Sequence, residues 1–430
     1  MKIENENIFV NLNDYFFKKL NILNYNSIEN LIKSMLFSIF INFEINLLTT
    51  ENKINLTSKF TFEIIKKINE LITNKLNNNI ITNETVKIEI CKVFKIYGAI
   101  FNSIGIYNKE ILYKIILLDF NYNNENTNIF NIFYIFSQKV INFYFNDINI
   151  INIIINSYIK FCIGLQNYCD NFFDKINEII FNIYNKDNLN FKCIDLMNCL
   201  YCKILESDSD KKQILIDKSF EIINNIFYNI KNIKKNIPEN IKSFCSLLNS
   251  FINKIPNFYD FFDNNNYINE KIFNDIFVYF NSILKEKTIE KDLHLKIIKF
   301  YISFYKTKFL LEFKKYHVKD LTFILFNNIK IDLLKDYVQL LNILFQINKN
   351  DFNSVVNEIY VSVDKNLPEI LCNYFENNKF EYELLLNNNN IDAKQKKLEK
   401  ILKDLFNALN SNNIKEKIYQ LIIEYSIKNN

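Results

Sequence analysis

Residues 84–104, ETVKIEICKVFKIYGAIFNSI, decide the fold class of this chain. Their apolar side chains recur every three or four positions, which is the period of one face of an α-helix. The members of this face are Val86, Ile90, Val93, Phe94, Tyr97, Ile100, Phe101 and Ile104. The same period returns in block after block along the chain, so the sequence predicts an all-α protein.

Few residues interrupt this helical pattern. The chain of 430 residues contains three glycines and three prolines. Tight β-turns and sharp helix ends depend on these residue types, so a protein built mainly of β-sheets is excluded. Helices are expected near 27–46, 57–77, 84–104, 107–119, 126–145, 148–166, 170–185, 189–206, 210–231, 239–254, 269–285, 290–306, 310–327, 331–348, 350–364, 392–410 and 412–427. Asn-rich or acidic breaks separate many of them, as at 121–128.

The expected helices pair into hairpins with a period near 40 residues, which is typical of HEAT or armadillo-like repeats. A single hairpin cannot bury its apolar faces alone, so neighbouring hairpins must stack. No linker of distinct composition divides the chain, and residues 1–430 are therefore predicted to form one continuous α-solenoid. A compact all-helical bundle is the alternative architecture.

The composition limits the function classes. The chain is 49% apolar and 23% charged, which is enough apolar material for a folded core. A net charge of +4 is small for this length and gives no basic stripe for nucleic acid. The first residues are acidic, without a signal-like apolar segment, and no membrane span is expected from the charge-free runs.

The cysteines and histidines are weak candidates for chemistry. Cys199 and Cys202, with Cys193 nearby, have the spacing of a zinc or redox pair, but no second ligand pair follows. They are interpreted as buried helix cysteines with free thiols, without metal or cofactor. For His294 and His317 a solvated or capping role is expected, since neither has a nucleophile motif beside it. Phosphate-binding glycine motifs are also absent, so the chain is not predicted to be an enzyme.

The densest basic stretch is Lys394–Lys403, KQKKLEKILK. Lys396, Lys397 and Lys400 are candidates for contact with an acidic partner. The pair Glu399 and Lys403 is more typical of a solvated helix face, which is the preferred interpretation.

Residues from Pro238 onward resemble a known family. The motif is Pro238-x4-Ser243-Phe244-x2-Leu247-Leu248-x7-Pro256, followed by Phe258 and Tyr259, and a later one is Ile343-Leu344-Phe345-x-Ile347-Asn348-Lys349-x2-Phe352. Both resemble helical hairpins near the C-terminal end of importin-β superfamily receptors of the transportin-SR and importin-13 branch. Proline suits a first helical turn and cannot continue a helix, which agrees with the placement of Pro238 and Pro256. The segment 238–360 carries the resemblance most clearly.

The resemblance implies a nuclear transport receptor that binds protein cargo non-covalently, and we expect Phe-Gly nucleoporins as further partners. It implies a location in the cytoplasm and nucleus. The repeats that would bind the GTPase Ran have no evident counterpart before Pro238, so weak or absent Ran-GTP binding is expected. A cytosolic HEAT-repeat scaffold is the alternative function. The sequence alone names no binding residue.

Overall fold

The computed structural model describes residues 84–360, except 123–124, 187–189, 233–236, 256–257, 259–266, 287, 308–310 and 329–330, together with Ile54, Thr61, Phe62, Ile65, Lys400 and Lys403. The helices predicted near 27–46, 57–77, 392–410 and 412–427 lie outside the described residues apart from isolated positions. The same holds for the basic stretch Lys394–Lys403.

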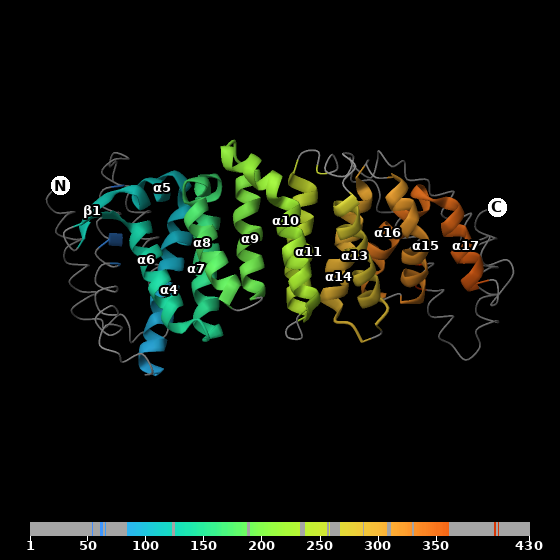
Figure 1. Ribbon diagram of the computed structural model, residues 1–430, viewed down its shortest axis with the longest axis horizontal. Coiled ribbons are helices and arrows are strands. Elements are labelled where there is room, and N and C mark those ends of the chain that lie inside the picture. The colour runs from blue at the N-terminus through green and yellow to red at the C-terminus, as the bar shows by residue number, and fades with distance from the viewer. Residues whose placement is uncertain are drawn as a thin grey trace. The chain divides into compact units, whose positions relative to one another are not determined.

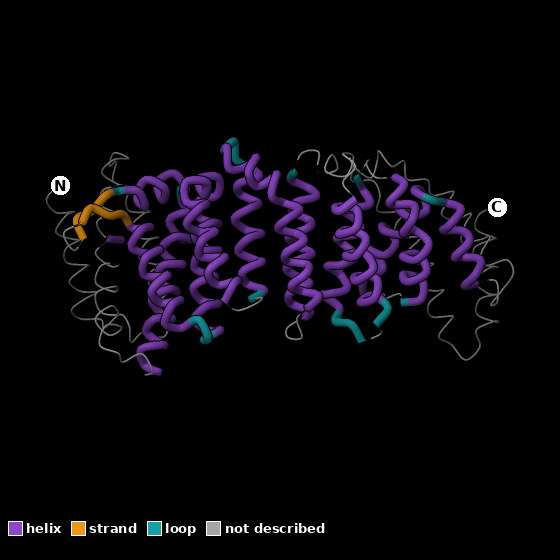
Figure 2. The backbone as a smooth tube through the Cα atoms, viewed as in Figure 1, coloured by secondary structure: helices purple, strands orange, loops and turns teal. Residues whose placement is uncertain are grey.

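The described part of the chain is almost entirely helical (Figures 1 and 2). The α-helices are α4 (Glu84–Tyr107), α5 (Lys109–Leu117), α6 (Ile129–Tyr144), α7 (Ile148–Leu165), α8 (Phe173–Lys186), α9 (Phe191–Leu205), α10 (Asp210–Asn232), α11 (Ile237–Lys254), α13 (Tyr267–Leu284), α14 (Lys291–Lys306), α15 (Leu311–Asn327), α16 (Leu334–Ile347) and α17 (Lys349–Tyr360). Two short 3-10 helices, η3 (Gln166–Phe172) and η4 (Ile331–Leu333), precede α8 and α16. Each α-helix lies within a few residues of a predicted one, so the all-α prediction is confirmed.

One predicted loop is wrong. Residues 121–128 were expected to be a break between helices, but strands β1 (Asp119–Tyr122) and β2 (Glu125–Asn128) form a short antiparallel hairpin there. The register pairs Asp119 with Asn128. Asn128 then caps α6, because its side-chain oxygen accepts a hydrogen bond of 2.9 Å from the backbone N–H of Asn131.

The chain divides into two compact units, Met1–Ser219 and Phe220–Asn430. Within each unit, consecutive helices form antiparallel hairpins that stack side by side, which is the arrangement of α-solenoid repeats. Successive hairpins begin at Ile129 and Phe173 in the first unit, and at Tyr267 and Leu311 in the second. These intervals are close to the predicted period of about 40 residues.

In the first unit, α4, α7 and α9 form a layer of parallel helices. Early residues of α4 contact residues just before α7, as in the ion pair of 3.2 Å between Lys87 and Asp147. Further along, the Ser157 hydroxyl of α7 donates a hydrogen bond of 2.6 Å to the Phe94 carbonyl of α4. Helices α6 and α8 lie in a second row, where Lys175 donates to Asn131 at 2.6 Å.

In the second unit, α11, α14 and α16 form the equivalent parallel layer. Helices α13 and α15 contact each other in the second row. Helix α13 runs antiparallel to α14, because Phe273 contacts Phe304 whereas Phe280 contacts Phe300. The chain then reverses direction again between α14 and α15, so α13 and α15 run in the same direction.

Aromatic side chains fill the core of each unit, as predicted. In the first unit Phe133 packs against Phe94, Tyr97, Phe101 and Tyr158, with ring centroids 4.5 to 6.1 Å apart. All five side chains are buried. Each contributes about 1.5 to 3 kcal/mol by leaving water, so these rings dominate the stability of the layer contacts.

One described stretch, Ile148–Tyr184, is long and apolar enough to cross a bilayer by length and composition alone. It comprises α7, η3 and α8. Core helices of globular proteins also meet this criterion, and 56% of the apolar window is buried inside the structure. Charged residues interrupt the stretch, which is why charge-free runs did not identify it; they are Lys160, Asp170, Asp174, Lys175 and Glu178. The expectation that no segment spans a membrane stays a prediction.

Candidate binding surface

Helix α11 exposes only a narrow polar stripe. Its apolar residues Ile241, Phe244, Leu248 and Phe251 are fully buried, as the sequence predicted. The opposite face carries a set of polar side chains spaced three or four residues apart, namely Glu239, Lys242, Ser246 and Ser250. Because such spacing follows one face of a helix, these side chains form a continuous line along the solvent side of the α11, α14 and α16 layer.

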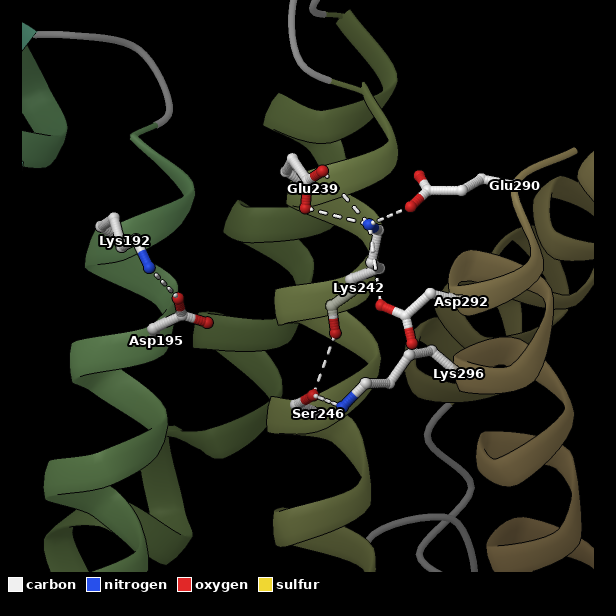
Figure 3. A network of polar contacts seen from close by, with 8 residues as sticks. All are labelled: Lys192, Asp195, Glu239, Lys242, Ser246, Glu290, Asp292 and Lys296. Carbon is white, nitrogen blue, oxygen red and sulfur yellow. Dashed lines mark hydrogen bonds and ion pairs between the residues drawn. The ribbon is translucent and has the colours of Figure 1, made fainter.

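Lys242 ties the start of α11 to the start of α14 (Figure 3). Its ammonium lies 3.1 Å from a carboxylate oxygen of Glu239, 3.0 Å from Glu290 and 3.7 Å from Asp292. Burial alone would lower the pKa of this ammonium, but the hydrogen bonds to Glu290 and Glu239 outweigh it and raise the pKa. Lys242 is therefore charged, and its ammonium forms ion pairs with all three carboxylates.

A second ion pair continues the line toward α16. Lys291, the first residue of α14, lies 3.0 Å from Asp332, which precedes α16. The acidic partners Glu290, Asp292 and Asp332 all lie in or next to the first turn of a helix, where the helix dipole favours negative charge. The three helices are thus linked by charged side chains at their N-terminal ends.

One turn further along α14, two lysines have no acidic partner in the described part of the chain. The Lys296 ammonium donates a hydrogen bond of 3.3 Å to the Ser246 hydroxyl (Figure 3). Within the described part of the chain, no carboxylate lies within ion-pair distance of Lys296 or of the exposed Lys299. This segment of the layer is therefore basic, and it is suited to a carboxylate or another anionic group.

The seam between α13 and α15 has a different, apolar character. Phe277 of α13 contacts His317 of α15, with ring centroids 4.8 Å apart. Each residue advances about 100° around a helix. Since α13 and α15 run in the same direction, the residue after Phe277 and the residue before His317 emerge on the same side of the seam. These residues are Val278 and Tyr316, which are 58% and 78% exposed.

A third apolar residue extends this surface. Phe323 lies seven residues after Tyr316, two helical turns along the same face of α15, and is 41% exposed. We call Val278, Tyr316 and Phe323 the α13–α15 seam residues. Sequence periodicity missed them because exposed apolar side chains look like core residues until the packing of the helix is known.

The expectation for the two histidines is wrong. His294 is buried, and one of its ring nitrogens is hydrogen-bonded to the Tyr337 hydroxyl of α16. His317 is also buried, beside Phe277, and burial lowers the pKa of its imidazole to about 4. Both rings face neighbouring helices rather than solvent, because their positions on α14 and α15 lie on the packed side of the helix.

Cys199 and Cys202 of α9 do not contact a common partner. Cys193 is buried, whereas Cys199 and Cys202 are half-buried. The Cys199 thiol donates to the Ile159 carbonyl of α7 at 3.9 Å, whereas the Cys202 thiol donates to the Asn198 side chain of its own helix at 3.5 Å. Among the described residues, no three His, Cys, Asp or Glu side chains are grouped closely enough to hold a metal ion.

The residues that carry the importin resemblance lie partly in the core. Pro238 occupies the first turn of α11, as predicted, while Pro256 and Tyr259 lie outside the described residues. Phe345 of α16 and Phe352 of α17 pack together, with ring centroids 5.3 Å apart. Comparison with protein-family models and with curated proteins finds no match to the chain.

Proposed function

We propose that this chain binds protein ligands non-covalently, in the manner of an importin-β-like nuclear transport receptor. The observation that carries the proposal is the chemical difference between two surfaces of the second unit. The α11, α14 and α16 layer offers polar and basic side chains, whereas the α13–α15 seam offers apolar ones. A receptor needs both kinds of surface, because cargo and the pore lining differ in chemistry.

The α13–α15 seam residues are proposed to bind Phe-Gly segments of nucleoporins. A phenylalanine side chain gains about 1.5 to 3 kcal/mol on full burial, so one shallow contact gives only weak binding. Weak contacts of this kind suit a receptor that must release each segment quickly. Val278 and Tyr316 lie next to the packed rings of Phe277 and His317. These buried rings form a rigid surface beneath an inserted phenylalanine side chain.

The basic segment of α14 is proposed to contact acidic residues of a protein cargo. Among the residues that the structure describes, Lys296 and Lys299 have no carboxylate partner, whereas Lys242 and Lys291 already have theirs. A carboxylate of the cargo therefore gains an ion pair at Lys296 and Lys299 without breaking one. Exposed ion pairs contribute little individually, so this surface supplies orientation and speed of association more than affinity.

Ran-GTP is expected to bind weakly or not at all, because the resemblance covers residues 238–360 and none of the family's Ran-binding repeats was recognised before them. A receptor of this kind is proposed to move between the cytoplasm and the nucleus.

Titration of the purified chain with Phe-Gly peptides and, separately, with Ran-GTP in physiological salt tests the proposal. Binding of the peptides without Ran supports it, and binding of neither ligand removes it.

The alternative is a cytosolic HEAT-repeat scaffold. The ion pairs that tie α11 to α14 and α14 to α16 favour this reading, because they oppose the flexing that cargo release requires. Affinity capture from native cytosol separates the two functions. Nucleoporins among the bound proteins favour transport, whereas coat proteins or tubulin favour a scaffold.

A further inference from the structure

Three cysteines from different helical elements meet in the first unit. Cys162 lies on α7, Cys169 on η3 and Cys199 on α9. The Cys162 thiol lies next to both of the other thiols. The Cys169 thiol also donates to the Cys162 backbone carbonyl, at 3.4 Å. Cys162 is therefore the central member of this cysteine cluster.

Cys199 points across the contact between α7 and α9. Its sulfur lies 3.9 Å from the carbonyl oxygen of Ile159, one turn before Cys162 on α7. The two helices run in the same direction, as the hydrogen bond of 2.9 Å between Asn190 and Asn152 also indicates. The thiols of Cys162 and Cys199 thus face each other across neighbouring helices of one layer.

The thiols of the cluster differ in exposure. Cys162 and Cys169 are fully buried, whereas Cys199 is half-buried. The neighbouring Cys162 thiol lowers the pKa of the Cys199 thiol, and the Lys203 ammonium lowers it further, although burial opposes both. The pKa of the Cys162 thiol is raised, first by its hydrogen bond with Cys169. A half-buried thiol with a lowered pKa beside a buried thiol with a raised pKa is the arrangement of an attacking and a resolving cysteine.

We propose that Cys199 is a site of oxidation by hydroperoxides and that oxidation joins it to Cys162 in a disulfide between α7 and α9. The Cys199 thiolate attacks the terminal oxygen of hydrogen peroxide, the O–O bond breaks, and hydroxide leaves. Cys199 becomes a sulfenic acid. The Cys162 sulfur then attacks the Cys199 sulfur, losing its proton as the S–O bond breaks, and the hydroxyl group leaves as water.

Oxidation links two helices of the parallel layer covalently. The spacing of Cys199 and Cys202 in the sequence had suggested that these two form a pair. The Cys202 thiol instead donates a hydrogen bond to Asn198 of its own helix. Two cysteines three positions apart on one helix do not require a tertiary contact. The partner from α7 lies 37 residues earlier and only the fold brings it close. The proposal is independent of the ligand that the second unit binds.

Mass spectrometry of the intact, fully reduced chain treated with hydrogen peroxide tests the proposal. Cleavage after lysine places Cys162 and Cys169 in residues 161–175, and Cys193, Cys199 and Cys202 in residues 193–203. The expected product is a cross-link between these two peptides, located by fragmentation at Cys162 and Cys199. Cys91 serves as an internal reference, because it is also half-buried but burial raises the pKa of its thiol.

Three variants assign the roles. In Cys162→Ala the cross-link is expected to disappear and dimedone is expected to trap a sulfenic acid at Cys199. Cys199→Ser is expected to remove both products, and Cys202→Ser, the matched control on the same helix, is expected to behave like the unmodified chain. Circular dichroism verifies that each variant is folded. A cross-link that persists in Cys162→Ala, a disulfide within residues 193–203, or oxidation of Cys199 no faster than that of Cys91 would overturn the proposal.

Discussion

Gly105 of α4 and Gly164 of α7 meet backbone to backbone. A Cβ atom at Gly105 would lie 2.3 Å from the Cα of Gly164, and one at Gly164 would lie 2.5 Å from the carbonyl oxygen of Phe101. Two of the three glycines in the chain therefore occupy one helix crossing. Their lack of side chains lets α4 and α7 approach closely enough to pack side by side.

Substitution of Gly164 by Ala is expected to destabilise the first unit by at least about 2 kcal/mol, because the new methyl group meets backbone atoms that cannot rotate away. The measurement is the denaturant midpoint of unfolding, followed by circular dichroism. Gly98→Ala is the matched control. Its methyl group would meet mainly the Cδ of Lys160, at 2.8 Å, and this flexible side chain can move. Equal losses in both variants would show that the close crossing is misplaced.

Phe244 and Leu247 of α11 are fully buried, and Phe244 contacts Phe280 of α13 with ring centroids 6.4 Å apart. Replacing either residue by Ala is expected to lower the free energy of unfolding of the second unit by about 2 to 5 kcal/mol, since a cavity forms in a packed core. Asn253→Ala, at an exposed position of the same helix, is the control and is expected to change stability by less than about 0.5 kcal/mol. Unchanged stability of Phe244→Ala would contradict the register of α11.

His317 makes the stability of the second unit depend on pH. Burial lowers the pKa of its imidazole to about 4, with the Asp320 carboxylate opposing the shift, from a usual value of 6.5. Between pH 4 and pH 6.5, His317 binds a proton in the unfolded chain but not in the folded chain. The free energy of unfolding is therefore unaffected by His317 above pH 6.5, and it falls by up to about 3 kcal/mol as the pH is lowered toward 4.

The test compares the pH dependence of the unfolding free energy of the unmodified chain with that of His317→Phe. Many carboxylates titrate in the same range, so the difference between the two curves isolates the imidazole. It is expected to change between pH 6.5 and 4 and to be constant above pH 7. Two parallel curves would show that His317 is solvated, as the sequence alone had suggested.

The helical period was sufficient to place the helices. The face that begins at Val86 predicted a helix over 84–104, and α4 spans Glu84–Tyr107. The hairpin at β1 and β2 was not predictable in the same way, because β1 alternates only over the short pair Phe120 and Tyr122, and β2 contains no apolar residue. Backbone pairing, rather than side-chain pattern, defines these strands.

Contacts between distant residues could not be predicted. The burial of His294 depends on Tyr337, which is 43 residues away, and the environment of Cys199 depends on Cys162 of another helix. A single helix shows which face is apolar but not which neighbour covers it. The α13–α15 seam residues illustrate the same limit, since Val278 and Tyr316 differ from core residues only in the packing around them.

The most direct test of the account is calorimetric titration of the full chain with a Phe-Gly repeat peptide, compared among variants of exposed apolar residues. Val278→Ser and Tyr316→Ser are expected to weaken binding at least threefold and to leave stability unchanged, because both side chains are exposed. Phe181→Ser on α8, which is 45% exposed in the other unit, is the matched control and is expected to bind normally. Peptide binding that Val278→Ser and Tyr316→Ser leave intact, or the absence of binding in the unmodified chain, would contradict the proposed receptor surface.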